Sequence, residues 1–183
     1  MEAIEAIHSR RTIRVYGPDP VDRGTLEKVL WAAVQAPTPP VSGTSAWKLC
    51  VIEGADRLAT YGDRAKRYAF EHQPPGQRWS WTERPDFKVF WNAPAVVLFC
   101  AKRSNPEAPF DCCRAAQNML VAAHALGLGT CWIGAPIPWL TSAGVAEELG
   151  IPDGYLASAA VLVGYAAESP VGEPRSQPVI RYC

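Results

Sequence analysis

The most continuous apolar pattern at helical spacing lies at residues 111–126. Its apolar positions cover most of the helix circumference and leave a narrow polar stripe; they are Ala115, Ala116, Met119, Leu120, Ala122, Ala123 and Leu126. Such a helix is expected to be buried nearly all round. Asp111 is its predicted N-cap, because the carboxylate can accept from free N–H groups of the first turn. Gly127 and Gly129 favour a helix end and a reversal into a strand at residues 130–133.

Similar patterns predict the elements around this central helix. Apolar residues at helical spacing indicate helices at residues 1–8, 22–36, 56–68 and 142–149, and a short helical turn at 87–92. Apolar runs at residues 47–52, 95–101 and 155–165 predict further strands, the last two of the buried kind. In the tail after residue 166, Val179 and Ile180 suggest that the chain ends by pairing with another element.

Residues 71–86 depart from this regularity. They contain three prolines, a glycine and two tryptophans, Trp79 and Trp81, which favours an irregular excursion over a helix or strand. Aromatic residues in an ordered excursion either cover a pocket or anchor the segment to the core. The sequence leaves both interpretations open.

Composition and charge limit the function classes. A chain of 183 residues with 48% apolar residues suits one folded domain, 1–183, and is too short for two ordinary ones. Its 18 basic and 18 acidic residues balance, so no global field favours nucleic acid or an anionic membrane. No secretory signal pattern is present and no apolar stretch approaches the ~20 residues that span a bilayer. We therefore expect a cytoplasmic protein.

Cysteines and histidines show no metal or catalytic pattern. The six cysteines, at positions 50, 100, 112, 113, 131 and 183, form no CxxC pair, and most lie in apolar helix or strand patterns. They are predicted to be buried, reduced thiols. His8, His72 and His124 have no evident partners, and no metal site and no catalytic side chain are predicted.

A concentrated positive charge follows the first predicted helix. Arg10, Arg11 and Arg14 lie within five residues, with Thr12 between them. Such a run is either a solvated surface or an anion clamp, because the guanidinium fork matches phosphate oxygens. Residues 37–46, PTPPVSGTSA, are similarly either a plain connector or a stiff wall that offers hydroxyls to a ligand.

Six segments carry a resemblance to a known family. They are SRRTIRVY at 9–16, AAVQAP at 32–37 leading to Trp47, NAPAVVLF at 92–99, DCCRAAQNMLVAAHALGLGTCWIG at 111–134, LGIP at 149–152, and VGY at 163–165 with Arg175 beyond it. In this order they resemble the nitroreductase-like flavoproteins, which include FMN-dependent nitroreductases, NAD(P)H oxidases, flavin-cleaving enzymes and iodotyrosine deiodinases. The resemblance covers nearly the whole chain.

The resemblance implies an α+β fold in which helices flank an antiparallel-dominated sheet. It also implies an intertwined homodimer around the long central helix, with two FMN sites at the interface. In matching positions, Arg10 and Thr12 resemble the residues that hold the FMN phosphate and ribityl chain, and Arg175 resembles the arginine that returns to the phosphate. Arg14 resembles the basic residue beside the flavin pyrimidine, and Arg11 is expected to add charge or backbone contacts.

Two further segments are matched to the flavin in the same way. Ile133 and Gly134 align with the strand end whose backbone amides face flavin N5, and Trp132 precedes them. Pro37, Thr38 and Pro39 match the loop that one subunit lends to its neighbour's flavin. The rest of that loop departs from the family: Ser42, Gly43, Ser45 and Ala46 stand where an asparagine and Gln-Pro are usual. Ser45 is our candidate polar contact there.

The expected function is an FMN oxidoreductase that takes a hydride from NADH or NADPH and reduces a nitroaromatic, quinone or similar small-molecule acceptor in alternation. The flavin carries this chemistry, so no acid or base side chain is needed. One alternative is a flavin-dependent oxidase or dehydrogenase of a specific small or peptide-like substrate, or a flavin-cleaving enzyme. Another is a non-catalytic flavin-binding dimer.

Overall fold

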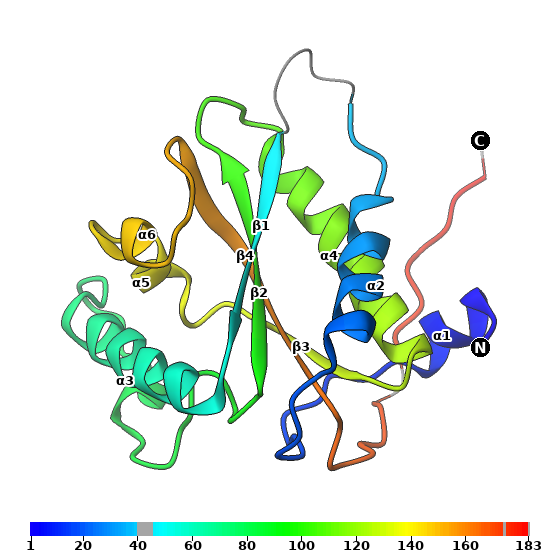
Figure 1. The fold of residues 1–183 in the computed structure, drawn as a ribbon, viewed down its shortest axis with the longest axis horizontal. Helices are drawn as coiled ribbons and strands as arrows, with labels where there is room; N and C mark the ends of the chain where they lie inside the picture. The colour runs from blue at the N-terminus through cyan, green and yellow to red at the C-terminus, as the bar shows by residue number, and fades with distance from the viewer. Residues whose placement is uncertain (40–45, 174, 183) are drawn as a thin grey trace.

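The computed structural model describes residues 1–39, 46–173 and 175–182 (Figure 1). Within them, four antiparallel strands form one sheet in the order β1-β2-β4-β3. The strands are β1 (Trp47–Glu53), β2 (Ala95–Lys102), β3 (Gly129–Ile133) and β4 (Tyr155–Gly164). All four strands predicted from the sequence are present, and each end lies within one residue of its predicted position.

Helices lie on both faces of the sheet. Helices α2 (Arg23–Val34) and α4 (Ala108–Ala125) cover one face, and α3 (Ala55–Glu71) and α5 (Ile137–Leu140) cover the other (Figure 1). The described residues also form α1 (Ala3–Ser9), the 3-10 helix η1 (Ser80–Glu83) and α6 (Val145–Glu148). No helix in the described part of the chain is long and apolar enough to cross a membrane.

Strand β2 shows why its sequence is continuously apolar. It lies inside the sheet between β1 and β4, with helices on both sides. Val97 and Phe99 pack with the α2 and α4 cluster, whereas Val96 and Leu98 pack with the α3 and α5 cluster, and all four are fully buried. A strand buried on both faces needs apolar residues at every position rather than at alternate ones. The predicted α+β fold, a sheet flanked by helices, is confirmed.

The central helix α4 begins three residues earlier than predicted. Its first residue is Ala108, its N-cap is Glu107 without a side-chain cap, and Pro109 occupies the first turn. A proline is well suited to that position, because its fixed φ matches the helix and its missing N–H has no intrahelical partner there. Asp111 therefore lies inside the first turn rather than capping it. Its carboxylate is buried and pairs with the Arg114 guanidinium of the same helix.

Within one chain, α4 is buried on one side only. The predicted apolar residues Ala115, Ala116, Met119 and Ala123 are fully buried against α2 and the sheet. Phe110 is 58% exposed, Leu126 just beyond the helix end is 46% exposed, and Cys113 and Gln117 between them are exposed. The expectation of burial nearly all round is therefore not met by a single copy of the chain.

Buried thiols account for most described cysteines. Cys100, Cys112 and Cys131 are buried and Cys50 is half-buried. Burial raises the pKa of the Cys100 and Cys112 thiols to about 12, so both are protonated near neutral pH. Cys113 is exposed on α4, and the prediction of burial is wrong for it.

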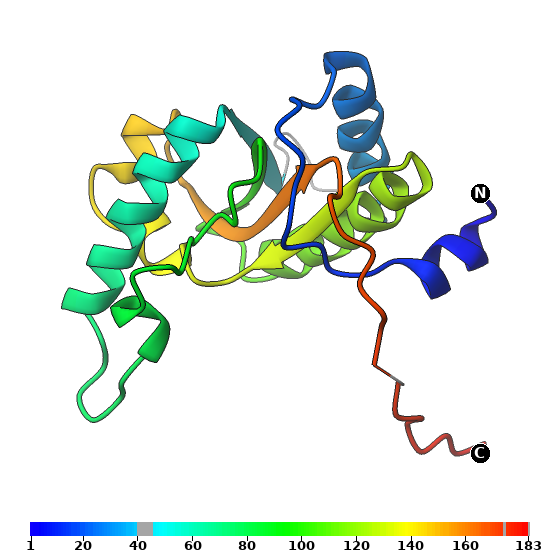
Figure 2. The same ribbon diagram turned by 90° about the horizontal axis from the view of Figure 1, so that it is seen from below.

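One other local prediction is wrong, and one is not met within a single copy. Residues 87–92 form turns instead of a helical turn, and Trp91 and Asn92 adopt left-handed backbone with φ 51° and 54°. In the tail, which extends away from the body in Figure 2, Val179 and Ile180 are 87% and 65% exposed. Within one copy the described tail residues after Ala166 form no strand or bridge, and pairing with a second copy stays a prediction.

Candidate functional site

The arginine-rich segment is held against the outer edge of the sheet. Thr12 forms a parallel bridge with Thr130 of β3, and the Ile13 N–H donates to the Thr130 carbonyl at 2.9 Å. Farther along, Tyr16 bridges to Ala166 in the chain that leaves β4. The Tyr16 hydroxyl donates to the Ile13 carbonyl at 2.8 Å, and burial raises the pKa of this phenol far above its usual range. Together these contacts fix the backbone on both sides of Arg14.

A carboxylate from the tail completes this attachment. Glu168 Oε1 accepts from the backbone N–H groups of Arg14 and Val15 at 2.8 and 3.2 Å. The Ala167 N–H donates to the Val15 carbonyl at 3.0 Å. The tail and the arginine segment are therefore joined before the tail reaches Arg175. Sequence reasoning missed Glu168, whose position just after the VGY motif gives no signal of a backbone contact 153 residues away.

Two glycines permit the close approach of this segment. A Cβ at Gly129, the first residue of β3, would lie 2.8 Å from Ile13 Cγ1. A Cβ at Gly164, the last residue of β4, would lie 2.6 Å from Pro94 Cδ and 2.9 Å from Tyr16 Cδ1. Contacts this short are not tolerated, so a side chain at either position would push the segment off the sheet.

Positive charges converge beside this attachment. The pKa of the half-buried Arg10 guanidinium is lowered, first by burial and then by the positive charges of Arg175 and Arg11. Among the described residues, none of these three guanidinium groups forms an ion pair with a carboxylate. Like charges gathered without a counterion are unfavourable until an anion binds between them. Arg175, 165 residues later in the chain, is thus near enough to influence Arg10, and the shared role of the two arginines at a phosphate stays a prediction.

Next to these arginines the surface is hollowed. The hollow has a volume of about 430 Å³, which lies within the range of small-molecule sites. Its lining is mostly polar and comes from both segments: Arg11, Thr12, Arg14, Pro170, Val171, Gly172, Glu173, Arg175 and Ser176. Four predicted cofactor residues, Arg11, Thr12, Arg14 and Arg175, therefore share one cavity, and Glu173 is the acidic group among them.

The Arg11 side chain also contacts the backbone at the end of α1. Its Nη1 donates to the carbonyl oxygens of His8 and Arg10, at 2.8 and 2.9 Å, and so satisfies acceptors at the end of α1. The tail also packs on this side chain, because a Cβ at Gly172 would lie 2.0 Å from Arg11 Nε. Arg11 thus ties α1 to the tail as well as lining the hollow.

The end of β3 is open. Trp132 is 41% exposed, Ile133 is 5% exposed, and Gly134 is exposed with no atom within 4 Å of the position of a Cβ. Strand β3 is the last strand of the sheet, and its only partner strand is β4 among the described residues. The backbone at Gly134 is therefore exposed to solvent.

The predicted loop residues lie elsewhere. Pro37, Thr38 and Pro39 are exposed, and the Pro37 carbonyl accepts from Arg114 Nε at 3.0 Å. By contrast, the arginine segment meets the other end of α4, where Ser9 Oγ lies 2.8 Å from His124 Nε2. Ten helical residues separate the two contacts, which is about 15 Å along the helix axis. Figure 1 shows the segments that follow α1 and α2 at opposite ends of α4. Ser45 lies outside the described residues.

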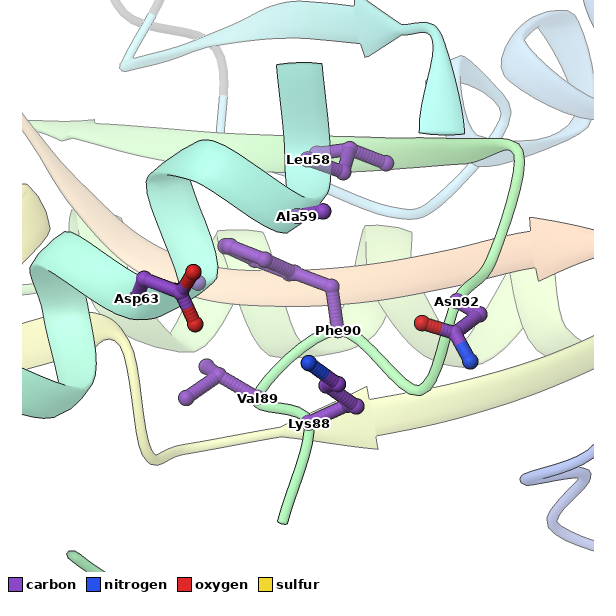
Figure 3. A pocket seen from close by; sticks show the side chains of 8 residues that line it. Leu58, Ala59, Asp63, Lys88, Val89, Phe90 and Asn92 are labelled. Carbon is purple, nitrogen blue, oxygen red and sulfur yellow. The ribbon is translucent and has the colours of Figure 1, made fainter. Parts of the chain in front are cut away.

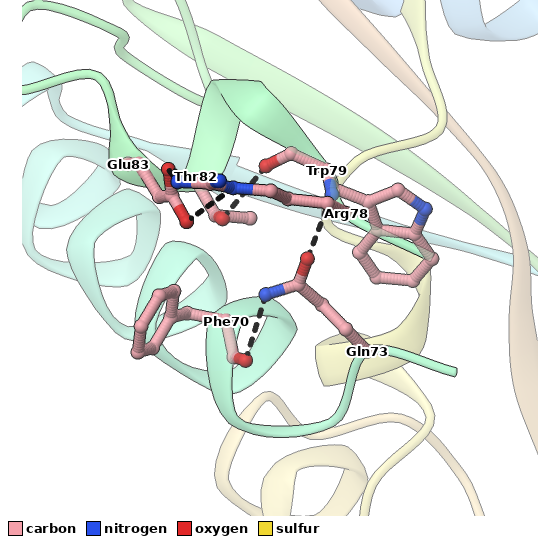
Figure 4. Close-up of polar contacts among 6 residues, drawn as sticks. All are labelled: Phe70, Gln73, Arg78, Trp79, Thr82 and Glu83. Atoms are coloured by element: carbon pink, nitrogen blue, oxygen red, sulfur yellow. Dashed lines mark hydrogen bonds and ion pairs between the residues drawn. The ribbon is translucent and has the colours of Figure 1, made fainter. Parts of the chain in front are cut away.

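The excursion at residues 72–86 is ordered by its own hydrogen bonds. The Gln73 side chain donates to the Phe70 carbonyl and accepts from the Trp79 N–H, at 3.0 and 2.7 Å (Figure 4). Arg78 and Glu83 form a bidentate pair beside η1. The rings of Trp79 and Trp81 stack with centroids 6.3 Å apart. Neither Trp79 nor Trp81 lines the hollow, so their predicted place beside a ligand stays a prediction.

A second, smaller crevice lies between α3 and residues 88–92 (Figure 3). Leu58 and Gly62 of α3 form one wall, and Val89 and Phe90 form the other. Its volume of about 10 Å³ is no more than one water requires. The crevice is a packing feature rather than a ligand site.

An antiparallel sheet with helices on both faces makes this an α+β protein. Residues 7–165 match the Nitroreductase family, so the chain belongs to that family. A relative from Archaeoglobus fulgidus, named "Putative NADH dehydrogenase/NAD(P)H nitroreductase", is 27% identical over 90% of this chain and 85% of its own. The resemblance inferred from the six sequence segments is confirmed.

Solved structures share the fold. A nitroreductase with bound FMN from Bacteroides fragilis superposes with a TM-score of 0.84 at 23% identity, over 97% of this chain and 95% of that one. Another nitroreductase with bound FMN, from Desulfitobacterium hafniense, gives 0.81 at 22% identity over 100% and 99%.

Proposed function

We propose that the protein is an FMN-dependent oxidoreductase that takes electrons from NADH or NADPH. The observation that carries the proposal is that Arg11, Arg14 and Arg175 line one hollow, and that among the described residues none of the three forms an ion pair with a carboxylate, which favours a bound anion. The phosphate of FMN is such an anion, and the neighbouring hollow of about 430 Å³ leaves room beside it. The FMN bound by relatives of the same fold, and the NAD(P)H in the name of the archaeal relative, support this choice.

Each predicted residue then has a role that its position allows. Arg10 and Arg175 hold the phosphate with charge-assisted hydrogen bonds, and the Thr12 hydroxyl binds the ribityl chain. Arg14 contributes positive charge beside the pyrimidine, which favours reduced FMN. The amides of Ile133 and Gly134 face N5, and Trp132 borders the ring. When bound, FMN accepts a hydride and passes electrons on, while the protein supplies position, charge and exclusion of water.

A second copy of the chain completes this site in our proposal. Pro37, Thr38 and Pro39 lie about 15 Å along α4 from the arginine segment of the same copy, so they would serve the neighbour's flavin, together with Ser45. The exposed Phe110 and Leu126 leave an apolar side of α4 for a partner helix to cover. Trp31 on α2, 67% exposed, and Ile4 on α1, 65% exposed, extend this surface. We therefore propose an intertwined homodimer.

The proposed acceptors are nitroaromatics, quinones or similar small molecules that occupy the place vacated by the nicotinamide. They alternate with NAD(P)H, because both must approach the same side of the flavin. A cytoplasmic location belongs to the same proposal, since NAD(P)H is available there and the buried thiols of Cys100 and Cys112 suit a reducing compartment.

An anaerobic titration tests the proposal. The purified protein is saturated with FMN, and the flavin absorbance is followed while NADH or NADPH is added without oxygen. Bleaching followed by recovery on addition of a quinone or nitroaromatic is the expected result. If FMN binds but neither coenzyme bleaches it, the protein is a flavoprotein with another activity and the NAD(P)H part of the proposal is wrong. If the protein does not bind FMN, the whole proposal is overturned.

A further inference from the structure

Trp91 and Asn92 have an unusual backbone. Their φ angles of 51° and 54° are the positive ones among the described non-glycine residues. Left-handed conformation is disfavoured for a bulky side chain, and it persists where the surrounding structure enforces it. Such strain is often found at functional sites, so this turn is a candidate for a functional role.

The turn sends two neighbouring aromatic rings in different directions. Phe90 is 3% exposed and packs in the core with α3, whereas Trp91 is half-buried. The Trp91 ring meets the guanidinium of Arg14, whose Cζ lies 5.7 Å from the ring centroid. This distance is within the range of cation–π attraction, and tryptophan is the strongest partner for it.

Three other rings fix the orientation of Trp91. Phe87 meets Trp91 edge-on at 5.3 Å, Trp81 meets Phe87 at 5.3 Å, and Trp79 stacks on Trp81 at 6.3 Å. We call these four residues the aromatic ladder. Its outer end is held by the hydrogen bonds of residues 73–83 described above. Through Phe87 the ladder thus packs against the Trp91 ring.

Arg14 is held at its other end as well. Its backbone N–H donates to Glu168 at 2.8 Å, and its side chain reaches the ring of Trp91. Among the described residues, its guanidinium forms no ion pair with a carboxylate. A carboxylate partner would fix the guanidinium but cancel its charge, whereas an aromatic face fixes it and leaves the charge in place.

We propose that Trp91 is a positioning residue that holds the Arg14 guanidinium beside the pyrimidine ring of FMN, without a carboxylate partner, and so raises the reduction potential of the bound flavin. This inference rests on the proposed function, because it needs FMN in the hollow that Arg14 lines. Beyond the proposed function, Trp91 controls where the charge of Arg14 lies.

The test measures the midpoint potential of FMN bound to the parent protein and to Trp91→Leu. Without the ring, the guanidinium loses its aromatic contact, and we expect the preference for reduced over oxidised FMN to fall three- to tenfold. At 29.6 mV per tenfold for a two-electron couple, this is a potential lower by about 14 to 30 mV. Trp91→Phe keeps an aromatic face, so it is expected to lower the potential by less than half as much as Trp91→Leu does.

Tyr61→Leu is the matched control. Tyr61 is a partly buried ring of the same core cluster and lies 5.6 Å from the Arg64 guanidinium, a different cation. Its loss is expected to lower the melting temperature without moving the potential. If Tyr61→Leu and Trp91→Leu lower the potential equally, the effect is general loosening and the inference is overturned.

A double variant separates this inference from the proposed function. Arg14→Leu is expected to lower the potential by more than Trp91→Leu, and adding Trp91→Leu to Arg14→Leu is expected to change nothing further. Additive shifts would overturn the coupling while leaving the FMN site intact. An Arg14→Leu variant with unchanged potential would overturn both the role of Arg14 and the inference, and failure of the parent protein to bind FMN would overturn the proposed function itself.

Discussion

Ser9 Oγ and His124 Nε2 lie 2.8 Å apart, and this contact joins the end of α1 to the last turn of α4. It brings an imidazole close to the proposed phosphate site. The pKa of His124 is lowered, first by burial and then by the positive charges of Arg10 and Arg11, while Glu5 opposes the shift. His124 is therefore a natural reporter of any anion that binds between those arginines.

We predict that FMN raises the pKa of His124, because the phosphate offsets the charges that lower it. The measurement is an NMR titration of the imidazole with and without FMN. Riboflavin, which lacks the phosphate, is the control and is expected to leave the titration unchanged. A His124 pKa that is the same with FMN and with riboflavin would contradict the placement of the phosphate.

The same shift makes stability depend on pH. A histidine whose pKa is lowered in the folded state binds fewer protons there than in the unfolded chain. Its contribution to the free energy of unfolding is therefore fully present above pH 6.5, the usual pKa of histidine. That contribution is lost as the pH falls below 6.5 through the lowered pKa. We predict that His124→Gln without FMN loses less stability between pH 7 and 5 than the parent protein, measured by urea unfolding. An identical pH profile for the two proteins would contradict the prediction.

A second prediction concerns the phosphate contacts themselves. Arg10→Ala or Arg175→Ala is expected to weaken FMN binding about ten- to a hundredfold, since charge-assisted hydrogen bonds contribute roughly 1.5 to 3 kcal/mol each. Fluorescence titration with FMN measures the effect. Arg23→Ala, which removes an exposed arginine paired with Glu53, is the matched control and should leave the affinity unchanged. If the parent protein binds riboflavin and FMN equally well, these arginines do not bind the phosphate and are solvated surface residues.

The sequence was sufficient for the fold because its strongest patterns are local. The apolar runs of β2 and β4, and the helical spacing that begins at residue 22, are patterns among neighbouring residues. The start of α4 was misplaced because Asp111 is a good cap by type, yet its carboxylate pairs with Arg114 inside the helix.

The candidate site was predictable only in part. Arg10, Thr12 and Arg175 belong to motifs that a resemblance can carry, and the fold brings Thr12 and Arg175 into the lining of one hollow. Glu168 and Trp91 belong to no such pattern, because their roles arise from backbone direction and from contacts made across the fold. Long-range contacts of this kind appear only when the chain is folded.

A third prediction tests the second copy. Phe110→Glu or Leu126→Glu adds charge to the exposed side of α4 and is expected to convert dimer to monomer, measured by sedimentation velocity. A stable dimer typically buries ~1,600 Å² or more, and a buried unpaired carboxylate would oppose it strongly. Ala116→Glu and Ala123→Glu are unsuitable probes, because both alanines are fully buried within one chain.

Phe70→Glu is the matched control for that experiment. Phe70 is 53% exposed and lies on α3, on the other face of the sheet, so its charge should leave the dimer intact. A parent protein that sediments as a stable folded monomer at micromolar concentration would contradict the dimer outright.

A fourth prediction concerns the outer end of the aromatic ladder. Replacing both Trp79 and Trp81 by alanine is expected to change the preference among nitroaromatic and quinone acceptors, measured as ratios of kcat/KM, more than it changes FMN affinity. The reason is that the two stacked rings belong to an excursion that is ordered without contributing to the hollow. An equal loss of both properties, or of neither, would assign the two rings to packing.

The last prediction follows from the approach of Ile13 to Gly129. A Cβ at Gly129 would meet three atoms of the buried Ile13 side chain at 2.8 to 3.0 Å, and a branched side chain next to the sheet has little room to move. Gly129→Ala is expected to destabilise the protein by about 1–3 kcal/mol, as overpacking commonly does, and to shift the arginine segment away from β3. FMN affinity should fall with it, because Arg10 and Arg14 flank Ile13.

Gly24→Ala on α2 is the matched control, since its Cβ would make an ordinary contact at 3.5 Å, and neither property should fall. Urea unfolding and FMN titration of both variants measure the two effects, and a Gly129→Ala protein with parental stability and affinity would show that the segment is not held by this contact.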